Sequence, residues 1–141
     1  MLVFVYGTLT DASRAREVLD VDGPPEYVAD AVVEGLRRVD GEYPTLVPGG
    51  ECEGRLLRVQ RSALHRLDAY EGVDHGLYVR IPLPFEGPTP GSDDGHAGTV
   101  ETYVGHPEKL DAPGSWPGTG SFGERVRGYV ERESVVVRRV D

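Results

Sequence analysis

The chain has 141 residues, a net charge of −9 and a single cysteine, Cys52. This length suits one domain over residues 1–141, large enough to bury a core without metal or disulfide staples. An acidic chain repels a phosphate backbone, so nucleic acid is not an expected partner. No apolar run approaches the ~20 residues of a membrane span, and the N-terminus lacks a signal-peptide pattern. The single cysteine allows no intramolecular disulfide, which fits a cytoplasmic location.

Arginine supplies nearly all of the basic charge, since Lys109 is the one lysine among 15 basic residues. An acidic surface with little lysine is what a protein soluble at high salt would carry. A genome that favours arginine codons would give the same composition, and both explanations stay open.

Apolar, β-branched runs predict strands, and apolar residues at helical spacing predict short helices. The strand-like runs, taken in chain order, are residues 2–6, 27–39, 45–47, 52–59, 77–83, 99–104 and 135–140. Helices are expected after Asp11, Ser62 and Ser121, because each of these side chains can cap a helix N-terminus. The second of these helices ends near residues 70–71, just before Gly72.

Two segments rich in proline and glycine, residues 84–98 and 106–120, are expected to be loops. The first is the expected exposed and disordered stretch. The count is six or seven short strands and two or three short helices, with no repeat and no regular β-α-β alternation. The sequence therefore predicts an α+β domain built on a closed or half-closed sheet.

The first candidate site is the turn Tyr6-Gly7-Thr8-Leu9-Thr10, where a buried strand runs into a glycine and a helix follows. Gly7 allows a sharp turn and a close approach of a ligand to the backbone. Successive N–H groups in such a turn can bind an anion. The alternative is an ordinary strand-to-helix turn.

The second candidate site is Leu67-Asp68-Ala69-Tyr70-Glu71-Gly72, at the end of the second expected helix. A carboxylate at a helix C-terminus is unfavourably placed against the helix dipole. Apolar and aromatic neighbours would raise its pKa toward neutrality, which suits a general acid and base. The alternative is a solvated glutamate at a helix end.

Three further short motifs accompany these two segments. In chain order, a Tyr-Pro turn at 43–44 and Glu53-Gly54 lie between the two segments, and Tyr78-Val79-Arg80 follows the second. The order and spacing resemble the γ-glutamyl cyclotransferase-like family, and most closely its short γ-glutamylamine cyclotransferase branch. The resemblance covers about residues 2–104. It implies a small mixed β-barrel of six or seven strands flanked by two or three short helices.

The resemblance also implies roles for individual residues, and no cofactor. Glu71 would be the catalytic acid and base, and Tyr78 would line the pocket. Arg80 would pair with a carboxylate, either the substrate's or an internal one. The glutamyl head group would be held by the backbone amides of Tyr6, Gly7, Thr8 and Leu9.

The implied activity is that of a transferase or lyase acting on a small γ-glutamyl substrate. The glutamyl α-amine would attack the γ-amide carbonyl and release 5-oxoproline with a free amine or amino acid. The alternative is a non-catalytic small-molecule binding module on the same scaffold. A nucleic-acid or protein adaptor is a third possibility, which no basic patch or long amphipathic helix supports. The leaving amine and the oligomeric state are not specified by the sequence.

The remaining reactive side chains are expected to be structural. No metal site is expected, because His65, His75, His96 and His106 lack ligand spacing. Cys52 is expected in the core, and Asp93-Asp94 are expected to be solvated. Trp116 would either line the pocket or anchor its loop on the core.

Overall fold

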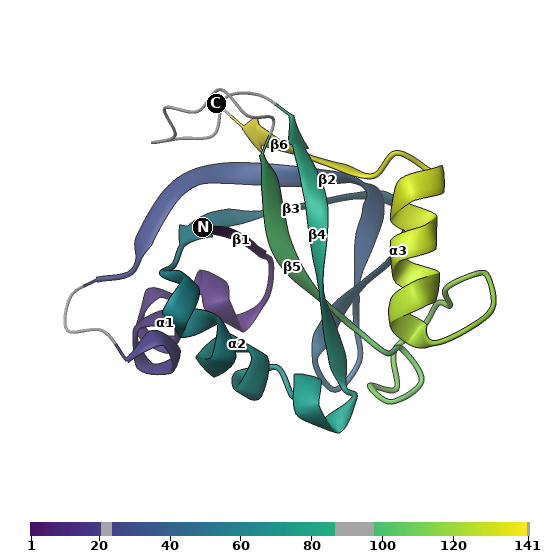
Figure 1. Cartoon of the computed structure of the whole chain (residues 1–141), viewed down its shortest axis with the longest axis horizontal. Coiled ribbons are helices and arrows are strands. Elements are labelled where there is room, and N and C mark those ends of the chain that lie inside the picture. The colour runs from purple at the N-terminus through teal and green to yellow at the C-terminus, as the bar shows by residue number, and fades with distance from the viewer. Residues whose placement is uncertain (21–23, 87–97, 141) are drawn as a thin grey trace.

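The strands of the chain close into a barrel with the neighbour order β1-β3-β2-β6-β4-β5 (Figure 1). The computed structural model describes residues 1–20, 24–86 and 98–140. The strands are β1 (Leu2–Val5), β2 (Glu26–Asp40), β3 (Pro44–Arg58), β4 (Tyr78–Glu86), β5 (Thr99–Gly105) and β6 (Val136–Val140). The pairs β1–β5 and β4–β6 are parallel and the other pairs antiparallel, which confirms a small mixed barrel.

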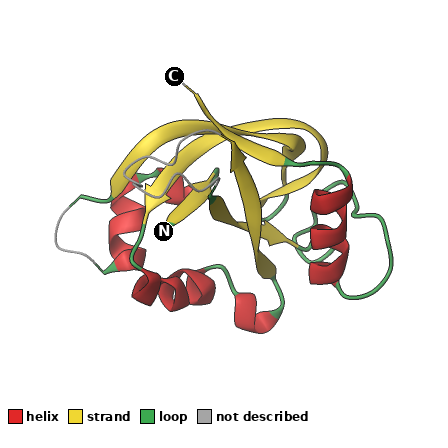
Figure 2. Ribbon diagram, turned by 45° about the horizontal axis from the view of Figure 1, so that its top comes forward, coloured by secondary structure: helices red, strands yellow, loops and turns green. Residues whose placement is uncertain are grey.

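In the described part of the chain, three α-helices flank the barrel: α1 (Ala12–Leu19), α2 (Leu64–Tyr70) and α3 (Phe122–Arg132). Helices α1 and α2 lie together on one side, and α3 lies on the opposite side (Figure 2). Two expected caps are confirmed, because Asp11 accepts from the N–H of Ser13 at 2.8 Å and Ser121 from that of Glu124 at 3.2 Å.

The expected cap at Ser62 is wrong. A 3-10 helix, Arg61–Ala63, precedes α2, and the N-cap position falls on Ala63 without a side-chain hydrogen bond. The N–H of Ala63 donates to the Gln60 carbonyl at 2.9 Å, so the backbone itself starts the helix here.

The expected separate strands at 45–47 and 52–59 are also wrong, since β3 runs unbroken through both. The ladder with β2 shifts register between Glu34 and Leu36, opposite Gly49 and Gly50. Both of these glycines have positive φ, 105° and 67°. The Pro-Gly-Gly signal therefore marks a β-bulge that bends the strand, not its end.

The interior divides into two apolar clusters on the two faces of β1. Phe4 packs in the barrel interior, whereas Val3 and Val5 pack under α1 and α2 with Leu67. Side chains alternate across a strand, so a strand covered on both faces must be apolar throughout. This confirms that residues 2–5 are buried on both faces.

Trp116 anchors the 106–120 segment on the core. Its ring lies edge-on to Tyr129 at 5.5 Å and to Phe122 at 6.4 Å between centroids, and it is buried. Of the two roles considered for this residue, the structure therefore supports the anchor.

The other expected loop, residues 84–98, begins later than predicted because β4 continues to Glu86. Most of that segment, with Asp93, Asp94 and His96, lies outside the described residues. No helix in the described part of the chain is long and apolar enough to cross a membrane.

A single methyl group at Gly54 should destabilise the barrel. The added Cβ would meet the Val5 carbonyl oxygen and lie 2.7 Å from the Phe4 ring, where β1 and β3 pack together. Overpacking of this kind costs typically 1–3 kcal/mol. We expect Gly54→Ala to lower the free energy of unfolding by about this amount in urea denaturation.

Gly128→Ala on α3 is the matched control. Its Cβ would have only the Arg132 guanidinium nearby, at 3.5 Å. Alanine in a helix interior is favoured over glycine by roughly 0.5–1 kcal/mol, so this variant should be slightly more stable. Equal stability of the two variants would contradict the packing argument.

Candidate active site

A cavity of about 290 Å³ opens at one end of the barrel, between the end of β1, the tip of the β2–β3 hairpin and the end of α2. Six of the seven predicted site residues line it: Tyr6, Gly7, Thr8, Leu9, Glu71 and Tyr78. Arg80 does not. The barrel therefore brings together two segments that are distant in the sequence.

The end of α2 places Glu71 at the cavity. Leu67 is fully buried in the core, and the Glu71 N–H donates to its carbonyl at 2.9 Å. Gly72 then takes a left-handed conformation with φ of 70°, which residues other than glycine rarely adopt. The chain turns here and leads into β4, so Glu71 stays fixed at the helix terminus.

Burial raises the pKa of the Glu71 carboxyl from an ordinary value of 4.5 to about 7. The residue is partly exposed at the pocket, and its carboxyl group is enclosed enough for desolvation to be the one cause of the shift. A carboxyl with this pKa is populated in both protonation states near neutral pH. It can therefore accept a proton and return it.

Tyr6, Tyr78 and Tyr103 line the same cavity as the Glu71 carboxyl. Its negative charge contributes to raising the pKa values of Tyr6, Tyr78 and Tyr103. Each hydroxyl donates its single hydrogen elsewhere: Tyr6 to the Tyr103 carbonyl at 2.5 Å, Tyr78 to the Pro44 carbonyl at 2.6 Å, and Tyr103 to Asp68 at 2.7 Å. The tyrosines thus share the cavity with Glu71 without donating to it, and its pKa stays high.

The turn after β1 forms the opposite wall of the cavity. A 3-10 helix, Thr8–Thr10, begins directly after Gly7, and the N–H groups of Thr10 and Asp11 donate to the carbonyls of Gly7 and Thr8. Within the described residues, no protein acceptor takes the N–H of Gly7, Thr8 or Leu9. These three amides are free to bind a ligand's carboxylate or carbonyl oxygen.

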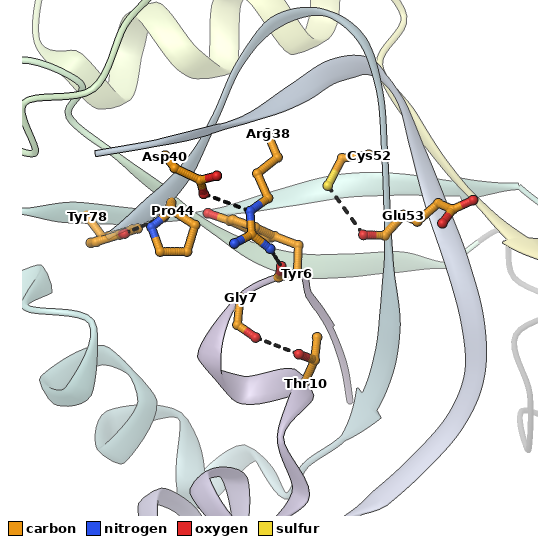
Figure 3. A network of polar contacts seen from close by, with 9 residues as sticks. All are labelled: Tyr6, Gly7, Thr10, Arg38, Asp40, Pro44, Cys52, Glu53 and Tyr78. Atoms are coloured by element: carbon orange, nitrogen blue, oxygen red, sulfur yellow. Dashed lines mark hydrogen bonds and ion pairs between the residues drawn. The ribbon is translucent and has the colours of Figure 1, made fainter. Parts of the chain in front are cut away.

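The hairpin between β2 and β3 supports this turn from the barrel side (Figure 3). Arg38 donates from Nη1 to the Tyr6 carbonyl at 2.8 Å, and its Nε lies 3.0 Å from Asp40. Pro44 packs against Gly7, where the Cβ of any larger residue would lie only 2.9 Å from the proline Cγ. Close packing against Pro44 therefore favours glycine at position 7.

Arg80 makes an internal ion pair. Its Nη1 lies 3.3 Å from Asp68, which also accepts from Tyr103. Of the two carboxylates considered from the sequence, the structure places Arg80 beside the internal one. The pair fixes Asp68, and through it the Tyr103 hydroxyl beside the cavity.

Sequence reasoning missed several lining residues, among them Arg14, Tyr43, Tyr70 and Tyr103. Tyr70 was visible as the neighbour of Glu71, and its hydroxyl lies 2.7 Å from the Thr8 hydroxyl across the mouth. Tyr43 belongs to the Tyr-Pro turn. Nothing local in the sequence marks Arg14 or Tyr103, because barrel closure and the α1 docking bring them here.

Cys52 is not a candidate nucleophile. It packs in the barrel core, and burial raises its pKa to about 11, so the unreactive thiol form dominates. Across residues 1–20, 24–86 and 98–140, no group of three His, Cys, Asp or Glu side chains is placed to hold a metal ion.

Solved structures with this fold cover nearly the whole chain. One named gamma-glutamyl cyclotransferase is 16% identical with a TM-score of 0.59, over 94% of this chain and 79% of that one. A protein from Arabidopsis thaliana is 25% identical with a TM-score of 0.55, over 94% and 76%. An uncharacterized protein from Pyrococcus horikoshii is 18% identical with a TM-score of 0.55, over 95% and 97%. No curated protein sequence matches significantly.

The profile of one protein family, described as "Gamma-glutamyl cyclotransferase, AIG2-like", matches residues 3–120. This match extends beyond residue 104, where the resemblance noted from the motifs ended. It includes the Gly7 turn, Glu71 and the whole of the segment 106–120 that Trp116 anchors. The chain therefore belongs to the gamma-glutamyl cyclotransferase, AIG2-like family.

Proposed function

We propose that this protein cyclises the glutamyl unit of a γ-glutamyl amine or γ-glutamyl amino acid, releasing 5-oxoproline and the free amine. The observation that carries the proposal is the Glu71 carboxyl, whose pKa of about 7 suits it to proton transfer inside the cavity. Family membership supports the reaction class.

In the proposed reaction, the neutral α-amine attacks the γ-carbonyl carbon and a five-membered ring closes. A new C–N bond forms in the ring, and the C–N bond to the departing amine breaks. One proton leaves the attacking nitrogen and reaches the departing nitrogen, and Glu71 accepts and then donates it. The atoms balance without an external reactant.

The turn amides of Gly7, Thr8 and Leu9 would hold the substrate's α-carboxylate or the carbonyl oxygen as it becomes negative. Because the attack is intramolecular, holding the folded-back conformer is the main task of the cavity. Orientation of this kind can lower a barrier by roughly 7–11 kcal/mol in favourable cases.

The finer assignments remain predictions: the γ-glutamylamine branch, a cytoplasmic location, and a small-molecule substrate without nucleic-acid or membrane partners. The rival function is small-molecule binding without turnover. A panel of γ-glutamyl amines and amino acids, with 5-oxoproline detected by mass spectrometry, separates the two. Binding of 5-oxoproline with no product from any panel member would support the rival.

Glu71→Gln should turn over at least ~100-fold more slowly than the parent protein, because general acid–base catalysis contributes typically 10²–10⁴ in rate. Glutamine keeps the shape and hydrogen-bonding capacity but cannot ionise. The variant should fold normally and still bind 5-oxoproline in calorimetry.

Glu108→Gln, which removes an exposed charge outside the cavity lining, is the control and should keep full activity. Near-parental turnover by folded Glu71→Gln would refute the mechanism.

The same carboxyl should make stability depend on pH in a defined direction. Between pH 4.5 and about 7, folded Glu71 retains a proton that the unfolded chain has released. Stability therefore falls as pH rises through this window. A shift of this size corresponds to about 3 kcal/mol when complete.

Glu71→Gln cannot lose this stability. We therefore compare the free energies of unfolding of Glu71→Gln and the parent by urea titration. The difference, variant minus parent, should rise by about 3 kcal/mol from pH 4 to pH 8. The Glu108→Gln difference should change far less. Parallel stability–pH curves for parent and Glu71→Gln would show that the carboxyl is not buried in solution.

A further inference from the structure

Arg38 is the charged side chain that acts directly on the Tyr6 carbonyl at the start of the turn after β1, yet it does not line the cavity. Its Nη1 donates to that carbonyl at 2.8 Å. Its Nε is paired with Asp40, two residues along the same face of β2, at 3.0 Å. The guanidinium is thereby held at both ends, as Figure 3 shows.

The peptide between Tyr6 and Gly7 links this contact to the cavity. No described peptide bond is cis, so the Tyr6 carbonyl and the Gly7 N–H point in opposite directions. The Tyr6 carbonyl points toward Arg38, which does not line the cavity. The Gly7 N–H, which donates to no backbone carbonyl among the described residues, therefore points away from Arg38, and Gly7 itself lines the cavity.

We propose that Arg38 is a positioning residue that orients the Gly7 N–H toward the oxyanion of a bound γ-glutamyl substrate. A charge-assisted hydrogen bond at the carbonyl also polarises the peptide and strengthens its N–H as a donor. The inference rests on the proposed function for its substrate. The hydrogen bonds of Arg38 on which the inference is based do not depend on that function.

Arg55 offers a closely matched control on the neighbouring strand β3. It donates from Nη1 to the Thr10 carbonyl at 3.3 Å and faces Asp30, and its side chain is 40% exposed against 45% for Arg38. The N–H that shares a peptide with the Thr10 carbonyl belongs to Asp11 and already donates to Thr8. Arg55 therefore supports the turn without orienting a free amide.

Arg38→Met should lower kcat/KM about 10-fold or more. Removing one hydrogen-bond donor to an oxyanion typically lowers the rate by 10²–10³-fold, and misorienting the donor should cause part of that loss. Arg55→Met should stay within about 3-fold of the parent. Arg55→Met should lose at least as much stability in urea as Arg38→Met, because the Arg55 guanidinium also lies over the Tyr27 ring, 3.7 Å from its centroid. In ¹⁵N-labelled protein, the Gly7 nitrogen resonance should move in Arg38→Met and stay in place in Arg55→Met, because that nitrogen senses the bond to the preceding carbonyl.

Equal activity losses in the two variants, or an unmoved Gly7 resonance in Arg38→Met, would overturn the positioning role. If no γ-glutamyl compound is converted, the proposed function fails. The Gly7 resonance, with and without added 5-oxoproline, then decides the Arg38 inference by itself. A parental Gly7 amide proton that does not shift with bound 5-oxoproline also overturns it.

A second arginine, Arg14, lines the cavity from α1. Within the described residues, no carboxylate pairs with its guanidinium, whereas Arg38, Arg55 and Arg80 all have acidic partners. Arg14 is exposed, whereas Glu71 is half-buried, so the guanidinium lies at the mouth of the cavity. The reacting carbonyl must lie beside Glu71, and the departing group extends outward.

We infer that Arg14 binds an anionic group on the departing amine, so that the favoured substrates are γ-glutamyl amino acids or peptides with a free carboxylate. A guanidinium can bind a carboxylate with two parallel hydrogen bonds. This inference also rests on the proposed function and refines its substrate class.

Two substrates that differ in one group test it: γ-glutamyl-alanine and its C-terminal amide. The parent should prefer the carboxylate by about 10-fold in kcat/KM, the size of one charged hydrogen-bonded contact. Arg14→Gln should lose that preference through a lower kcat/KM on the carboxylate. Arg16→Gln, on the same helix and outside the lining, should keep it.

Equal parental rates on the two compounds, or equal losses on both in Arg14→Gln, would overturn the Arg14 assignment and leave the cyclotransferase function standing. If neither compound nor any other panel member is converted, both the Arg14 assignment and the cyclotransferase function are refuted.

Discussion

The burial of one carboxyl group determines how the rest of the site is arranged. Glu71 is held at the end of α2 by the buried Leu67 before it and the left-handed Gly72 after it. The tyrosines around it donate their hydroxyl hydrogens to other acceptors, so the cavity surrounds the carboxyl without solvating it. An uncompensated buried carboxyl is destabilising, and it persists only because the surrounding contacts fix its position. The same desolvation that weakens the fold near neutral pH gives the group a pKa suited to proton transfer.

Closure of the barrel is what brings the two halves of the site together. The turn after β1 carries free amides, and α2 carries the carboxyl, with β2 and β3 between them in the chain. Neither segment has both parts of the chemistry. The Tyr6 hydroxyl crosses to β5, and the Tyr103 hydroxyl on β5 reaches Asp68 on α2, so hydrogen bonds connect the halves through the barrel wall. The positions of the amides and the carboxyl are therefore linked through the barrel strands and these hydrogen bonds.

Much of this architecture follows from local sequence signals. The apolar run at 2–5, the caps at Asp11 and Ser121 and the Gly72 stop all rest on short-range physics, and all are found. The misplaced strand end has a long-range origin. Pro48-Gly49-Gly50 reads as a strand end in isolation, yet pairing with β2 across Gly35 carries the strand through as a bulge. No local sequence pattern marks Arg38, Arg14 or Tyr103 as site residues. Only tertiary contacts with residues distant along the chain bring them to the site.

Each residue type in the segment 67–71 makes a different contact, which explains why these residue types occur together. Leu67 docks the helix, Asp68 holds Tyr103 and Arg80, Tyr70 reaches the Thr8 hydroxyl, and Glu71 faces the cavity. Helical spacing places residues three and four apart on one face, so a five-residue segment can both pack and present a reactive group. In the proposed reaction, such a motif specifies the reacting centre and says little about the departing group. Under the proposed function, that selectivity would come from residues at the mouth, Arg14, Tyr43 and Tyr70, where the chain is exposed and can change without disturbing the buried carboxyl.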